Sequence, residues 1–230
     1  MSFLNKVPFF EDAEEEEGKT VFIRTVERVT EAIAGDLIKW WKRVRSMVDG
    51  NEFITVSGGD QHQASGELST ILGGWSAITD LYGQVAHASG TFSKIGQAQH
   101  GILIARHETT NNNPQNLKLD GYDDRLILKD DSAWAFHILV AGLRVTVGQA
   151  GAAWTIEGMI RKGQTPASTT LIGSTVTQIA YEAGLTWAAP YVSPDTVAGA
   201  LSITCQGAAG DHVRWVAVVD YVDLGSFVYV

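Results

Sequence analysis

The chain is poor in cysteine, in clustered positive charge and in long apolar runs. Its 230 residues include one cysteine, Cys205, which excludes an internal disulfide framework and a cysteine-rich metal site. The strand-like sequence around Cys205 predicts a small buried apolar residue. The formal net charge is -9 and no basic block stands alone, so phosphate-directed binding of nucleic acid is not expected.

No stretch has the sustained hydrophobicity of a membrane span or of a secretion signal. A spanning helix needs roughly 20 apolar residues, and no run in this sequence approaches that length. The first 18 residues turn acidic after ten and have no apolar core. We therefore expect synthesis in a cytoplasm, without a signal peptide, and, if the protein works outside a cell, release by a route other than secretion.

Motifs for catalysis, metal binding or cofactor binding are also missing. The six histidines show no HExxH pattern or other metal-ligand spacing, and there is no GxSxG or phosphate loop. Five aspartates cluster around two expected turns, where aspartate is common: Asp120, Asp123, Asp124, Asp130 and Asp131. We predict no enzymatic activity, no metal and no cofactor. His87 and His100 leave an alternative open. They flank the glycine-rich tract described below, and if three chains assemble around that tract, their histidines near the threefold axis could together hold an ion.

A glycine-punctuated tract at residues 64–99 is the feature around which the rest is organised. Shifted against itself by seventeen residues, it aligns Gly66 with Gly83 and Gly73 with Gly90. Side-chain type recurs as well, since Trp75 falls on Phe92 and Ile78 on Ile95. Glycine at fixed spacing is typical of stacked β turns, although a two-copy match can also arise by chance. Two units are too few for a stable array, so we predict that other chains supply the missing neighbours.

This interpretation makes the tract the core of a homotrimer. Glycine suits such a position because strands that meet near a symmetry axis approach too closely for a Cβ. The predicted trimer-core residues are Gly66, Gly73, Ile78, Gly83, Gly90 and Ile95.

Residues 1–50 are predicted to form an amino-terminal arm followed by an amphipathic helix. Apolar residues spaced by three or four along residues 19–48 lie on one helical face. The period is also compatible with a parallel coiled coil, and the basic, aromatic end with a membrane surface. We favour docking on another protein, through Phe22, Trp40, Trp41 and Arg43.

Residues 101–230 alternate between apolar and polar side chains, with polar turns between the runs. Trp134, Phe136, Ile138 and Val140 share one strand face. Asp120-Gly121 is typical of a hairpin turn between residues 117–119 and 125–128. The expected fold is mainly β: residues 1–50 as arm and helix, residues 51–100 as connector and short trimeric β-prism, and residues 101–230 as an antiparallel jelly-roll-like sandwich.

Two blocks of sequence resemble a known group of proteins. The tract SGELSTILGG…YGQVAHASGTFSKIGQAQ resembles the head repeats of trimeric β-prism fibres in bacterial adhesins and phage tail fibres. The later segments DDSAWAFHILVAGLRV, AAWTIEGMIRKG and DHVRWVAVVDYVDL resemble the carboxy-terminal β domain of phage fibre proteins. The repeat is short and carries bulkier side chains than such heads usually do, which favours a stubby trimer.

The resemblance implies a structural virion protein, a short homotrimeric tail fibre. Its amino terminus would attach to a tail, baseplate or capsid protein, and its β domain would bind a host-surface glycan or protein. An alternative is a capsid cement protein without a receptor, and a third is a depolymerising enzyme, against which the absence of an acid pair argues. Loop chemistry suggests these receptor contacts: Asn111, Asn112, Asn113, Tyr122 and Trp187.

Overall fold

The computed structural model describes residues 54–146 and 148–225. The predicted arm and helix, with Phe22, Trp40, Trp41 and Arg43, lie outside the described residues. Within the described part the chain is mainly β, which confirms the predicted class. Its one helical element is a 3-10 turn, η2 (Pro166–Ser168). None of the described residues belongs to a helix with the length and apolar character required to cross a membrane.

The amino-terminal part of the described chain winds into short parallel coils. It consists of β1 (Thr55–Val56), β2 (Gln63–Ala64), β3 (Thr70–Trp75), β4 (Ile78–Thr79) and β5 (Val85–Ser89). Strand β3 pairs in parallel with β1 on one side and β5 on the other, and β2 pairs in parallel with β4. Parallel neighbours that follow each other so closely in sequence define a stacked coil.

The coil repeat is fifteen residues, which corrects the seventeen-residue period. Thr55 pairs with Thr70, and Thr70 pairs with Val85. The register places Ile71 beside Ala86, and both side chains are buried, so stacking aligns residues that face the interior. The glycine spacing does not follow the coil, because Gly66 lies against Leu81, whose carbonyl oxygen would stand 2.2 Å from an added Cβ.

The interior of the coils is filled by the chain itself. Small side chains and one isoleucine form a separate buried cluster: Ala64, Ile71, Ala77, Ala86 and Ala88. His62 closes one end, where its Nε2 donates to the carbonyl oxygen of Gly58 at 2.9 Å and its Nδ1 accepts from the N–H of Ala77 at 3.1 Å. The interior of the coils is therefore buried within one chain, while Leu68, Leu72 and Trp75 remain exposed on the outside of the tract, and the trimer core stays a prediction.

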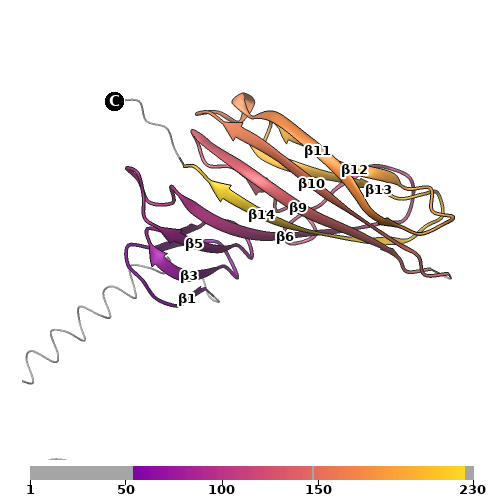
Figure 1. Cartoon of the computed structure of the whole chain (residues 1–230), viewed down its shortest axis with the longest axis horizontal. Helices are drawn as coiled ribbons and strands as arrows, with labels where there is room; N and C mark the ends of the chain where they lie inside the picture. The colour runs from indigo at the N-terminus through magenta and orange to yellow at the C-terminus, as the bar shows by residue number, and fades with distance from the viewer. Residues whose placement is uncertain (1–53, 147, 226–230) are drawn as a thin grey trace, which may run out of the picture. The chain divides into compact units, whose positions relative to one another are not determined.

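The coils continue into a large sheet with the order β1-β3-β5-β6-β14-β9-β10-β11, drawn in Figure 1. From β5 onward all neighbours are antiparallel. The added strands are β6 (Gln99–Thr109), β14 (Val213–Asp223), β9 (Ser132–Arg144), β10 (Gly151–Lys162) and β11 (Thr170–Tyr181). Strand β14, the last in sequence, lies between β6 and β9 and pairs with both, so the end of the described chain is inserted into the middle of the sheet.

A smaller sheet covers one face of the large one. It contains β12 (Ala188–Asp195), β13 (Ala200–Gln206), β7 (Gln115–Asn116) and β8 (Leu126–Ile127). Both β7 and β8 pair with β13, so the segments around Asp120-Gly121 lie along one strand and do not form the predicted hairpin. The antiparallel sandwich is present, while the jelly-roll arrangement is not confirmed, because the strands divide into two unequal sheets.

The core lies between the two sheets and is rich in aromatic rings. Trp134, Phe136, Ile138 and Val140 are buried together, as their alternation predicts. Cys205 is buried in the same core, also as predicted, and burial raises the pKa of its thiol. Trp187, directly before β12 of the smaller sheet, packs edge to face against Trp215 of β14, with ring centroids 5.1 Å apart.

Candidate functional site

The predicted trimer-core residues all lie in the coils or in the turn that follows them. Gly73, at a register shift within β3, Gly83, in the turn before β5, and Gly90, just after β5, adopt positive φ angles of 131°, 62° and 155°, which suit glycine. Ile78 lies on β4 and Ile95 in the turn before β6, and both are partly buried. The structure accounts for these residues within one chain, and their role in a trimer stays a prediction.

Trp187 is not available as a receptor contact in this chain. Its side chain is 5% exposed, and its indole Nε1 donates to Asp211 Oδ2 at 2.9 Å. The ring packs against Trp215, so a residue expected in an exposed loop belongs to the core. Its large apolar area explains the difference, since burying the ring is favourable and Asp211 supplies the acceptor that a buried indole N–H usually has.

The three asparagines occupy an exposed turn between β6 and β7. Asn111 Oδ1 accepts a hydrogen bond from the N–H of Asn113 at 2.8 Å, which closes an Asx turn. The carbonyl oxygen of Asn112 accepts from Gln206 Nε2 at 2.7 Å, tying the turn to β13. This turn precedes Pro114 and Gln115, which line a surface hollow described below.

Tyr122 stands at the tip of a rigid acidic turn and is 80% exposed. Asp120 Oδ1 accepts hydrogen bonds from the N–H groups of Tyr122, Asp123 and Asp124 at 2.8–3.0 Å. Burial alone would raise the pKa of Asp120, but these hydrogen bonds outweigh it and lower the pKa. Arg106 Nη2 donates to the carbonyl oxygen of Asp120. The ring of Tyr122 is therefore exposed on a turn that is held by the hydrogen bonds of Asp120 and Arg106.

A first hollow of about 760 Å³ lies between this turn and the ends of β6 and β14. Its charged wall is formed by Glu108, which accepts from Arg214 Nε at 2.7 Å and lies 2.9 Å from His212 Nε2. These two bonds, first the one from His212 and then the one from Arg214, lower the pKa of Glu108. The carboxylate is thus held in place and ionised at neutral pH.

A second hollow of about 450 Å³ adjoins the first and shares His107 and Tyr122 with it. On its floor, Thr204 pairs across the strands with Tyr191 on one side and Asn116 on the other. Thr204 Oγ1 donates to Asn116 Oδ1 at 2.7 Å, and Tyr191 is about half exposed. We call the two adjoining hollows the Tyr122 site, defined by Tyr122, Tyr191, Asn116, Lys118, Thr204 and Glu108.

Sequence analysis found Tyr122 but missed Tyr191, Asn116 and Thr204. Alternation places Tyr191 on the face of β12 opposite to the buried Val192. The pairing of β12 with β13 is what brings Tyr191 beside Thr204, and no local pattern specifies that pairing.

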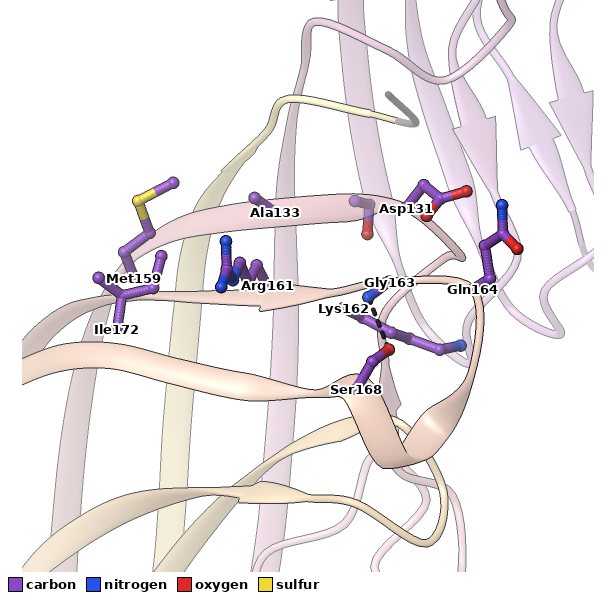
Figure 2. A pocket seen from close by; sticks show the side chains of 10 residues that line it. Asp131, Ala133, Met159, Arg161, Lys162, Gly163, Gln164, Ser168 and Ile172 are labelled. Atoms are coloured by element: carbon purple, nitrogen blue, oxygen red, sulfur yellow. Dashed lines mark hydrogen bonds between the residues drawn. The ribbon is translucent and has the colours of Figure 1, made fainter. Parts of the chain in front are cut away.

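A third hollow, of about 770 Å³, lies where β9 begins and β10 ends. Figure 2 shows Asp131, Arg161 and Gln164 on one side of the ribbon, while Ser168 accepts from the N–H of Gly163 at 2.9 Å. Lys162 is not free to bind a ligand, because its Nζ contacts Asp130 at 2.8 Å and the carbonyl oxygen of Leu128 at 2.9 Å. None of the described residues that line this hollow has an aromatic ring, in contrast to the Tyr122 site.

The described residues contain no group of three or more His, Cys, Asp or Glu side chains placed to hold a metal ion. The Tyr122 site brings together two tyrosine rings, an amide, a hydroxyl, one lysine and the Glu108 carboxylate, groups that can stack and form hydrogen bonds.

No protein-family model matches the chain, and no curated protein sequence matches it. Structural comparison finds tailspike proteins of Acinetobacter phages. The tailspike of Acinetobacter baumannii bacteriophage Fri1, described as a capsular polysaccharide depolymerase, is 12% identical with a TM-score of 0.33, over 76% of this chain and 33% of that one. The tailspike of Acinetobacter phage vB_ApiP_P1 is 10% identical with a TM-score of 0.30, over 74% and 38%.

The tailspike of Acinetobacter baumannii phage AM24 is 11% identical with a TM-score of 0.27, over 66% of this chain and 33% of that one. The chain thus spans about a third of the length of these tailspikes. The solved structures that it resembles are, at this coarse level, β-rich phage tailspikes.

Proposed function

We propose that this chain is a structural protein of a phage virion, a short homotrimeric tail fibre that binds a glycan on the host surface. The observation that carries the proposal is the Tyr122 site, in which two exposed tyrosine rings flank a row of amide and hydroxyl groups. The sequence resemblance to fibre proteins supplies the biological setting.

The site matches what a sugar requires of a protein surface. Tyrosine offers a large, rigid, amphipathic surface at a low entropy cost, which suits the apolar face of a sugar ring. Asn116 and Ser193 offer donors and acceptors for the hydroxyls of the sugar, the buried Thr204 orients Asn116 through its hydrogen bond, and Lys118 can pair with a carboxylate of the glycan. Shallow open sites of this kind bind weakly, and three copies on one particle would act together through avidity.

The remaining parts of the proposal concern attachment and localisation. Residues 1–50, through Phe22, Trp40, Trp41 and Arg43, would dock on a tail, baseplate or capsid protein, and the chain would then be part of the virion.

The competing role is that of a capsid cement protein. It predicts no host adsorption and a loss of particle stability when the protein is missing, whereas a fibre adsorbs to the host and blocks infection.

The test is binding of the full chain to purified host capsular polysaccharide. Tyr122→Ala and Tyr191→Ala should each raise the dissociation constant about tenfold, the effect of losing roughly 1.4 kcal/mol of contact. Phe92→Ala is the matched control, because Phe92 is an equally exposed ring outside the site and should leave binding unchanged.

Loss of binding in the Phe92 variant alone, or equal binding by all variants, would overturn the assignment of the site. Release of reducing sugar during the assay would instead identify a depolymerase, and a variant series would then locate the acid residues.

A further inference from the structure

The large sheet has one face buried under the smaller sheet and an opposite, outer face that is open and apolar. Six large aliphatic side chains on β6, β9 and β14 are between 37% and 55% exposed: Ile104, Leu139, Leu143, Val216, Val218 and Val222. Their strand neighbours Leu103, Ile138, Val140, Ala217 and Val219 are fully buried on the other face. Both faces of these strands are therefore apolar, which is typical of strands covered on both sides.

The register concentrates the outer apolar side chains at the centre of the sheet. Val218 on β14 lies opposite Ile104 on β6 and opposite Leu139 on β9, so the three form one row across three strands. Exposed apolar area on the order of several hundred Å² is at the upper end for a monomer, and a standard interface takes about 800 Å² from each partner. We call this surface the outer face, centred on Ile104, Val218 and Leu139.

The carboxylates on the outer face have basic side chains beside them. Asp220 Oδ1 lies 2.7 Å from His100 Nε2, and Glu157 Oε1 lies 3.9 Å from His137 Nε2. Glu108, which accepts from Arg214, belongs to the Tyr122 site at the end of the face and lies outside the covered centre. Covering a carboxylate that already has a partner costs less electrostatic free energy than covering an isolated one.

From these observations we infer that the outer face is covered by other copies of this chain. A basic partner would require carboxylates without partners, and the carboxylates of this face are already paired. With its carboxylates paired, the face attracts a partner mainly through apolar packing, and threefold symmetry can bring the same face of three identical copies together around one axis. This inference rests on the proposed homotrimer and moves its contact surface from the glycine tract to the sheet.

The first test is the molar mass of the full chain at micromolar concentration, by light scattering. The paired substitution Val218→Lys with Leu139→Lys places charges at the centre of the face and should raise the dissociation constant of the assembly at least about 100-fold. Val197→Lys, at a more exposed apolar residue in the turn after β12, is the matched control and should keep the wild-type mass.

Leu72→Lys probes the glycine tract, since Leu72 is an exposed residue of β3. If this variant dissociates while the paired variant keeps its mass, the inference is overturned and the homotrimer stands. If the wild type is a dimer that only the paired variant dissociates, the inference stands and the trimer falls. A monomeric wild type overturns both.

Hydroxyl-radical labelling of the wild type gives a readout that does not depend on a variant folding. If other copies cover the outer face, Leu139 and Ile104 should be labelled several-fold more slowly than expected from their exposed fractions in a single chain. Val197 and Tyr122, outside the covered face, should be labelled rapidly. Labelling of Leu139 at the rate of a half-exposed leucine, in a sample whose mass is that of an assembly, would show that another surface holds the copies together.

Discussion

Asp223, at the end of β14, is a carboxylate buried within the described part of the chain, with 1% of its side chain exposed. Its Oδ1 accepts a hydrogen bond from the N–H of Gly225 at 2.8 Å, and Lys129 Nζ lies 3.7 Å from its Oδ2. Burial is the largest influence and raises its pKa, and the nearby Lys129 only partly compensates. The ionised carboxylate is thus less stable in the folded chain than in water.

The sign of the pH dependence follows from this raised pKa. The folded state holds the proton more tightly than the unfolded state, whose pKa is near 3.8, so the contribution of Asp223 to stability is complete below about pH 3.8. It is lost as the pH rises through the folded value. Asp223→Asn keeps the acceptor for Gly225 and removes the titration, so wild type should lose stability relative to this variant as the pH rises.

Urea unfolding of both proteins at intervals between pH 3.5 and 7 measures this difference. A gap between the two unfolding free energies that stays constant over the range would contradict the assignment.

Between residue and fold, the coils show how glycine is used at two different kinds of position. Gly66 lies directly against the backbone of the next coil, and a Cβ there would stand 2.2 Å from the carbonyl oxygen of Leu81. Gly83 has open space around its Cβ position but a positive φ of 62°. The first position excludes a side chain by contact and the second only by conformation.

Gly66→Ala should therefore cost more stability than Gly83→Ala. We expect a loss of about 2–3 kcal/mol at Gly66, because the coils must separate, and about 1 kcal/mol at Gly83, the ordinary penalty of a left-handed residue. Thermal unfolding of the two variants side by side checks the order. Equal losses would mean that the coils are not stacked in the fifteen-residue register.

In the molecule as a whole, aromatic side chains connect the two sheets. Trp187 contacts Trp215 of the large sheet, and Trp215 in turn lies 6.1 Å from Trp154 between ring centroids. Asp211 fixes the indole of Trp187 through the hydrogen bond to Nε1. These three tryptophan rings connect one sheet of the sandwich to the other, so we expect the two sheets to unfold together.

Trp187→Ala is expected to lower the free energy of unfolding by about 3–5 kcal/mol, as for other large-to-small changes in a core. The transition should stay a single one, and Trp187→Phe, which retains a ring but lacks the N–H, should lose less. Circular dichroism and intrinsic fluorescence followed through the same denaturant series provide the measurement. A variant that binds glycan poorly while its stability is unchanged would restore Trp187 to the binding surface.

Local sequence determined a good part of this architecture. Alternation in β9 specifies that Trp134, Phe136, Ile138 and Val140 share a buried face, because successive side chains of a strand point to opposite sides. The turns at Asn111–Asn113 and at Asp120 were predictable for a similar reason, since asparagine and aspartate side chains bond to the backbone two or three residues ahead.

Other features were decided only by tertiary pairing. The fifteen-residue coil, the burial of Trp187 and the meeting of Tyr122 with Tyr191 all depend on which distant strands lie side by side. Alternation shows that a strand has two faces, but it does not show which face the rest of the chain covers. The sequence by itself therefore determined a β-rich chain with its turns and one strand face of its core, and the pairing of β6, β9 and β14 decided which apolar face remains open.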